Sequence, residues 1–69
     1  MFEIFKTSVE SATQTTALLA LLHNKFPCVE INFDLEDCDN ILRVKGGGFC
    51  SLHIIQILAD NGFDCQVIE

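Results

Sequence analysis

The chain of 69 residues contains no tryptophan or tyrosine, a single proline, and only four lysine or arginine residues against ten aspartates and glutamates. Its formal net charge is therefore −6, and its pI is about 4.5. Proteins bind nucleic acids and anionic membrane surfaces largely through lysine and arginine side chains that neutralise phosphates. This shortage of cations predicts that the chain binds neither nucleic acid nor an anionic membrane.

Long apolar runs are also absent. No stretch approaches the roughly 20 apolar residues that a membrane-spanning helix requires. Residues 1–6 lack the basic start, the apolar run and the small-residue cleavage site of a secretory signal. We therefore expect a cytoplasmic protein whose thiols stay reduced and form no disulfide framework.

Closely spaced cysteine pairs are missing as well. The four cysteines, Cys28, Cys38, Cys50 and Cys65, are at least ten positions apart. A soft metal or a redox couple is usually held by a Cys-x-x-Cys turn, because two thiols on one short turn arrive already positioned. The spacing excludes a local clamp of this kind.

What the chain does contain is a high apolar fraction, 49%, arranged in regular patterns. Residues 2–7 are rich in aromatic and β-branched side chains, which predicts a strand. Ser11 and Gln14 have the spacing of a capping box, so a helix should begin there and run to about Lys25, before Pro27. Its inward-facing stripe is predicted to be Thr15, Leu18, Leu19, Leu22 and Phe26.

A hairpin is predicted next. Residues 29–34 and 41–45 alternate between apolar and polar side chains, which is typical of strands covered on one face. Val29, Ile31 and Phe33 should face the core from the first strand. Leu42 and Val44 should face it from the second. Arg43 and Lys45 then lie opposite Glu30 and Asn32 on the solvent face.

The last part of the chain predicts a second helix and a final strand. Gly46–Gly48 interrupt the preceding strand, and a helix should start at Cys50 or Ser51 and end at Asn61–Gly62. The core side of this helix is predicted to be Leu52, Ile55, Leu58 and Ala59. Residues 63–68 should form a strand with Phe63, Cys65 and Val67 on one face.

These elements give a single domain over residues 1–69 with the order βαββαβ. Right-handed crossovers then produce an α+β, ferredoxin-like two-layer sandwich: a four-stranded antiparallel sheet of order 4-1-3-2, with both helices on one face. One face of the sheet is thereby left without a covering helix.

The length, the element order and the Gly62–Phe63 entry to the last strand make the chain similar to the heavy-metal-associated domain of copper chaperones and metal-transporting ATPases. That family holds its metal on a Met-x-Cys-x-x-Cys turn after the first strand. The corresponding stretch here, residues 6–12, contains no thiol, imidazole or thioether. The resemblance therefore implies the fold and assigns no metal ligand. An ACT-like ligand-binding module is an open alternative with the same topology.

The topology also brings two histidines and two cysteines to one end of the domain: His23, Cys28, Cys50 and His53. These are the donor types of a zinc or copper site, so a divergent metal-binding protein is the alternative function. We expect no metal or cofactor, however, because Cys28 alternates with Val29 and should point away from the helices. Cys50, at a helix amino terminus, is also a candidate reactive thiol.

The densest charge lies in the turn of the hairpin, at Asp34, Glu36, Asp37 and Asp39. The spacing does not match an EF-hand calcium loop. We interpret the cluster as a solvated turn or as a docking surface for a basic partner. Cys38 should be exposed in this turn, and Cys65 should be part of the core.

No motif indicates catalysis, since neither histidine has a recognisable nucleophile partner and no carboxylate pair lies in an apolar segment. The functional clue is the surplus of apolar residues. Phe5, Ile41 and Ile68 are predicted on the uncovered face of the sheet, where an apolar patch marks an association surface. We therefore predict a non-enzymatic binding or adaptor module that forms a homodimer or binds another protein.

Overall fold

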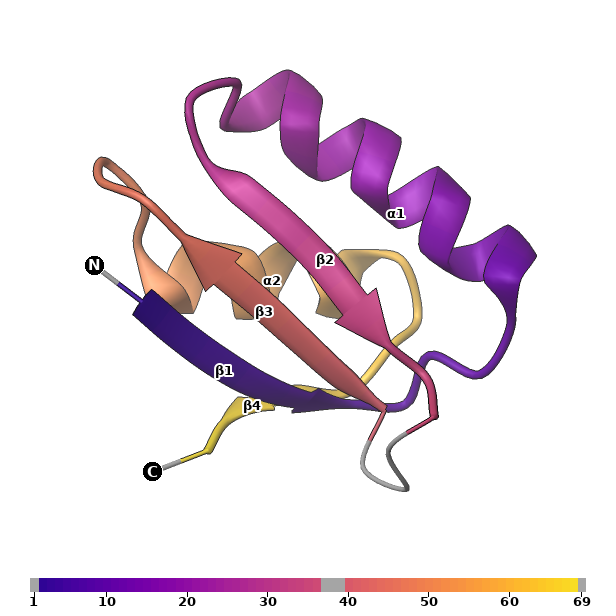
Figure 1. The fold of residues 1–69 in the computed structure, drawn as a ribbon. Coiled ribbons are helices and arrows are strands. Elements are labelled where there is room, and N and C mark those ends of the chain that lie inside the picture. The colour runs from indigo at the N-terminus through magenta and orange to yellow at the C-terminus, as the bar shows by residue number, and fades with distance from the viewer. Residues whose placement is uncertain (1, 37–39, 69) are drawn as a thin grey trace.

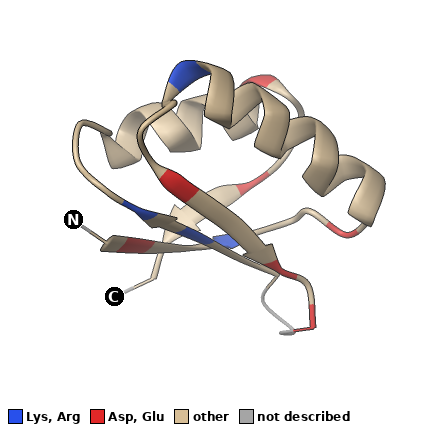
Figure 2. Ribbon diagram, turned by 45° about the horizontal axis from the view of Figure 1, so that its top comes forward, with Lys and Arg blue, Asp and Glu red and all other residues tan. Residues whose placement is uncertain are grey.

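The computed structural model describes residues 2–36 and 40–68 (Figure 1). Within these residues the predicted element order is confirmed. It consists of β1 (Phe2–Thr7), α1 (Ala12–Lys25), β2 (Glu30–Asp34), β3 (Ile41–Lys45), α2 (Ser51–Asp60) and β4 (Cys65–Val67). Both helices lie on one side of a single sheet (Figure 2), so the architecture is ferredoxin-like α+β.

The sheet has the order β2-β3-β1-β4, which is the predicted order read from the other edge. All three strand pairs are antiparallel. In the hairpin, Glu30 lies opposite Lys45 and Asn32 lies opposite Arg43, as the alternation predicted. The shared face of β2 and β3 therefore pairs acidic and amide side chains with cations.

Helix α1 begins at the predicted capping box. The backbone N–H of Gln14 donates to Ser11 Oγ at 3.1 Å, and the Gln14 side chain accepts from the Ser11 backbone N–H at 3.2 Å. Two amides that a helix start leaves without intrahelical partners are thus satisfied. Leu18 and Leu22 point into the core, whereas Ala17 and Ala20 are exposed.

Helix α2 is rotated relative to the prediction. Ile54, Ile57 and Leu58 are its buried residues, while Leu52, which was expected in the core, is 74% exposed. The helix carries apolar side chains around much of its circumference, so two inward stripes of helical spacing compete in the sequence. Packing against the sheet selects the stripe that starts at Ile54.

Strand β4 is shorter than predicted because the backbone of Phe63 takes part in the C-terminal cap of α2. The N–H of Gly62 donates to the Ala59 carbonyl at 3.0 Å, and the N–H of Phe63 donates to the Leu58 carbonyl at 2.9 Å. This is a Schellman motif, with Gly62 in the left-handed conformation at φ +88°. Because the Phe63 N–H is bonded to the helix, Phe63 lies before the strand. Pairing of β4 with β1 starts at Cys65.

The core lies between the sheet and the two helices. Partly buried side chains from β4 and from both helices, including Cys65 and Val67, pack around its edge. Its buried members are Phe5, Val9, Leu18, Leu22, Phe26, Val29, Ile31, Leu42, Val44, Phe49, Ile54, Ile57 and Leu58.

Phe5 corrects the prediction for the uncovered face. It is fully buried, and it pairs with Leu42 on the helix side of the sheet. Because side chains alternate along a strand, the residues of β1 on the uncovered face are Phe2, Ile4 and Lys6. The prediction had the wrong phase for β1, and an error of one position moves every side chain to the other face.

Candidate functional site

The face of the sheet that carries no helix is the candidate functional site, and we call it the open face (Figure 2). Its residues follow from the pairing registers and the alternation of side chains along each strand. They are Glu30, Asn32 and Asp34 from β2; Ile41, Arg43 and Lys45 from β3; Phe2, Ile4 and Lys6 from β1; and Gln66 and Ile68 from β4 and its continuation.

The half of the open face on β2 and β3 is charged and largely self-compensating. Arg43 Nη2 lies 3.0 Å from Asp34 Oδ2, in a partly exposed ion pair. Lys45 lies opposite Glu30 in the register. Exposed pairs of this kind stabilise a fold by less than about 1 kcal/mol, so their main effect is on what the surface attracts or repels.

The other half, on β1 and β4, contains three apolar side chains: Phe2, Ile4 and Ile68. We call these the apolar patch. Phe2 is 54% exposed, Ile68 is 39% exposed and Ile4 is partly buried. The Ile68 N–H donates to the Ile4 carbonyl at 2.9 Å, so these two residues are cross-strand neighbours. Among the described residues of this half only Lys6 is charged, and it lies at the end of β1 away from Phe2.

Of the three residues predicted to form the apolar surface, only Ile68 is exposed. Phe5 belongs to the core, as described above. Ile41 lies on the open side of β3, but it is only 6% exposed and therefore offers little area to a partner. Phe2 and Ile4 take their place, and a correct phase for β1 would have identified both from the alternation alone.

The four proposed metal donors are all exposed: His23, Cys28, Cys50 and His53. The His53 ring makes an edge-to-face contact with the Phe26 ring at 5.3 Å between centroids. No group of three or more histidine, cysteine, aspartate or glutamate side chains within residues 2–36 and 40–68 is placed to hold a metal ion. These four residues therefore form no donor cluster.

The acidic turn is described only in part, because Asp37, Cys38 and Asp39 lie outside the described residues. Asp34 Oδ1 accepts a hydrogen bond from the Glu36 N–H at 3.1 Å, so this carboxylate shapes the turn as well as pairing with Arg43. Thr7 Oγ1 donates to the Asn40 carbonyl at 2.7 Å.

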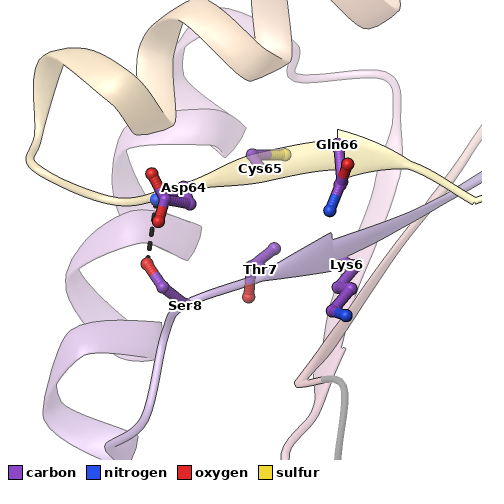
Figure 3. A pocket seen from close by; sticks show the side chains of 6 residues that line it. All are labelled: Lys6, Thr7, Ser8, Asp64, Cys65 and Gln66. Atoms are coloured by element: carbon purple, nitrogen blue, oxygen red, sulfur yellow. Dashed lines mark hydrogen bonds between the residues drawn. The ribbon is translucent and has the colours of Figure 1, made fainter.

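A groove of about 440 Å³ lies along the ends of β1 and β4 (Figure 3). Its walls are joined at Ser8 and Asp64: the Ser8 N–H donates to the Asp64 carbonyl at 3.1 Å, and the Asp64 N–H donates to Ser8 Oγ at 2.8 Å. The sequence gives no sign of it, because the lining comes from segments more than 50 positions apart. The lining residues are Lys6, Thr7, Ser8, Asp64, Cys65 and Gln66.

The thiol in this groove is not activated. Burial raises the pKa of Cys65 from 9.0 to about 12, so the thiol stays protonated near neutral pH. A thiolate nucleophile needs a lowered pKa and a nearby base, and no histidine lines the groove. The Cys50 side chain, at the start of α2, makes no capping hydrogen bond.

None of the helices in the described part of the chain is long and apolar enough to cross a membrane. Comparison with known proteins gives no match among family models, curated proteins or solved structures.

Proposed function

We propose that the chain is a small non-enzymatic binding module, with the heavy-metal-associated type of fold but without that family's metal turn, which binds a protein through its open face. The observation that carries this proposal is the apolar patch. Phe2 and Ile68 are two of the three large hydrophobic side chains that the described residues leave exposed, and both border Ile4 on the side of the sheet that no helix covers.

The patch is placed to supply binding energy. Taking an apolar side chain from full exposure to full burial contributes about 1.5 to 3 kcal/mol. Phe2 is 54% exposed and Ile68 is 39% exposed, so each can contribute about half of that or less when a partner covers it. The sheet also presents these side chains on hydrogen-bonded strands, so little backbone entropy is lost on binding. The third exposed hydrophobic side chain, Leu52, lies on the helix layer, where it is separate from this patch.

The charged half of the open face contributes selectivity. Arg43 and Lys45 on β3 lie directly opposite Ile4 and Phe2 on β1, so each of these apolar residues has a cation as its cross-strand neighbour. A partner that covers the patch must also accommodate these cations. Electrostatic complementarity of this kind affects partner choice and association rate more than affinity.

A non-enzymatic role is supported by the chemistry of the groove. Its thiol has a raised pKa, and the lining offers no imidazole to take a proton. Asp64 bonds to Ser8 through its backbone carbonyl and N–H, and the Ser8 hydroxyl accepts from that N–H, so these bonds do not pair the Asp64 carboxylate with the hydroxyl as a base with a nucleophile.

The proposal is tested by selecting peptides from a random displayed library on the immobilised chain and mapping them by ¹⁵N–¹H chemical-shift perturbation. We expect the shifts to centre on Phe2, Ile4 and Ile68. Phe2→Glu should weaken the selected peptides by at least about tenfold, and Leu52→Glu, the same change at an exposed site on the helix layer, should not. Peptides that map to α1 and α2 and respond to Leu52→Glu would show that the open face is not the binding surface.

A further inference from the structure

We infer that Asn61 is a modification site: the C-terminal cap of α2 blocks its spontaneous deamidation, and the reaction begins when that cap opens. The inference does not depend on what the open face binds. It starts from the sequence Asn61–Gly62, because glycine has no side chain to hinder its own backbone nitrogen. Asn24, Asn32 and Asn40 are instead followed by lysine, phenylalanine and isoleucine.

Asparagine is chemically labile, and its deamidation needs only hydroxide and water. Hydroxide removes the proton of the Gly62 N–H, and the amide nitrogen attacks the side-chain carbonyl carbon, Cγ, of Asn61. The Cγ–Nδ2 bond breaks, and the nitrogen leaves as ammonia with a proton from water, which regenerates the hydroxide. Water then opens the resulting five-membered succinimide ring at either carbonyl. The products are aspartate and isoaspartate, in which the main chain runs through Cβ and Cγ.

The folded backbone holds the two reacting atoms apart. Asn61 has ψ 9°, so the Gly62 nitrogen is nearly eclipsed with the backbone nitrogen of Asn61 itself. Cβ lies about a third of a turn around Cα from that nitrogen, because Cα is tetrahedral. Ring closure requires the Gly62 nitrogen to rotate to the Cβ side, which the capped conformation prevents.

Hydrogen bonds hold both reacting groups in this conformation. Asn61 Nδ2 donates to the Ile57 carbonyl at 2.8 Å, in a partly buried bond. The Gly62 N–H donates to the Ala59 carbonyl at 3.0 Å, so the proton that hydroxide must remove is held by an acceptor. The cap must therefore open before Asn61 can react.

This cap lies in a part of the molecule where local opening requires little free energy. Asp60, Asn61 and Gly62 are exposed, and the strand that follows, β4, has only 3 residues and lies at an edge of the sheet. Exposed segments with few buried contacts open at a lower free energy than the whole domain. Asn61 should therefore react from a locally opened state and not only from the unfolded chain.

The product cannot rebuild the cap. A carboxylate in place of the Asn61 amide no longer donates to the Ile57 carbonyl, and it adds negative charge at the C-terminus of a helix, where the helix dipole is itself negative. Isoaspartate also lengthens the main chain, which moves the N–H groups of Gly62 and Phe63 away from the helix carbonyls. Deamidation is thus a one-way change that loosens the end of α2.

The first test compares the folded and the unfolded chain. The full chain is kept in mildly alkaline buffer with and without guanidinium chloride, and proteolytic fragments are analysed by mass spectrometry. In denaturant, Asn61 should deamidate faster than Asn24, Asn32 and Asn40. Without denaturant, its rate should be at least about tenfold lower. Equal rates at Asn61 in the two conditions overturn the inference, as does an unfolded chain in which Asn61 is no faster than the other three.

The second test asks which opening permits the reaction. Ala59→Gly adds backbone freedom to the last turn of α2, so Asn61 should deamidate roughly threefold faster in this variant. Ala17→Gly makes the same change at an exposed position of α1 and should leave the rate unchanged. Circular dichroism verifies that both variants are folded. Equal acceleration in both would mean that Asn61 reacts only after global unfolding, and no acceleration in Ala59→Gly would mean that the cap is not the barrier. Either result overturns the inference.

The third test measures the effect of the product on the cap. Asn61→Asp introduces the carboxylate of the aspartate product, so hydrogen exchange at the Gly62 and Phe63 amides should accelerate at least about threefold. Exchange at the Thr15 amide, which bonds to the Ser11 carbonyl at the start of α1, should not change. Unchanged exchange at Gly62 and Phe63 would overturn the inferred loosening of α2.

Discussion

Phe5 and Leu42 lie opposite each other on the central strands β1 and β3, and both side chains are fully buried on the helix side of the sheet. This pair fixes the phase of β1. With Phe5 turned inward, Ile4 and Phe2 must face the other way, and the apolar patch follows from that alternation.

Replacing Phe5 and Phe2 by leucine should have very different effects on stability. Phe5→Leu removes volume from a closed core and should cost about 1 to 2 kcal/mol of unfolding free energy. Phe2→Leu makes the same change at a side chain that is 54% exposed and should stay within about 0.5 kcal/mol. Urea unfolding followed by circular dichroism measures both. Equal losses would show that Phe2 is not on the open face.

Much of the fold was predictable because local signals agree with one another. The capping box at Ser11, the break at Pro27 and the alternation around Arg43 each specify their own element. These signals depend on neighbours a few positions apart, and the structure confirms all three.

The errors occurred where a sequence pattern permits two answers. Residues 2–5 are apolar at Phe2, Ile4 and Phe5, so alternation alone does not say which set faces inward. In α2, Leu52 and Ile54 each begin an apolar stripe of helical spacing. In both cases the side chains that face inward are those that fit the space between the sheet and the helices. That fit depends on residues from distant segments, so the local pattern does not give it.

The sequence predicted an apolar surface on the uncovered face of the sheet, but it identified only some of the residues that form this surface. An apolar surface on the uncovered face followed from composition and topology, whereas its membership depended on the phase of β1. The groove at Ser8 and Asp64 had no sequence signal, because it results from two distant segments meeting at the end of the sheet.

The glycines after β3 offer a test of local backbone geometry. Gly46 has φ +141°, and a Cβ there would lie 3.3 Å from Val29 Cα. Gly46→Ala should therefore destabilise the protein by about 1 to 3 kcal/mol. The next glycine, Gly47, has no positive φ, and a Cβ added there would meet no atom within 4 Å. Gly47→Ala should be neutral to within about 0.5 kcal/mol. Thermal unfolding distinguishes the two, and equal effects would contradict the close approach at Val29.

The capping box at the start of α1 should contribute measurably. Ser11→Ala removes the hydroxyl that accepts from the Gln14 N–H and should cost about 1 kcal/mol. Thr13→Ala alters an exposed position inside the same helix and serves as the control. Hydrogen exchange at the amides of the first turn should accelerate in the Ser11 variant alone. Unchanged exchange there would mean that the cap contributes little to the helix.

The Cys65 thiol should make stability depend on alkaline pH. Its pKa is raised from 9.0 to about 12 by burial, so the folded state holds this proton at pH values where the unfolded state has lost it. The stabilisation is complete below pH 9 and is lost as pH rises from about 9 to 12. Because the folded state binds more protons in that window, the unfolding free energy must fall there as pH increases.

Cys65→Ala isolates this contribution, since it removes the titrating group and leaves a small apolar side chain at the edge of the core. Urea unfolding at several pH values should show a shallower decline of the unfolding free energy in the variant than in the parent chain between about pH 9 and 12, after their stabilities are matched near pH 8.

Alkylation at pH 8 gives an independent readout. Cys28 and Cys50 are exposed and should react well before Cys65, whose thiolate is about a thousandfold scarcer at a pKa three units above 9.0. Equal rates at all three thiols would mean that Cys65 is solvated like the others, and its raised pKa would then have no physical basis.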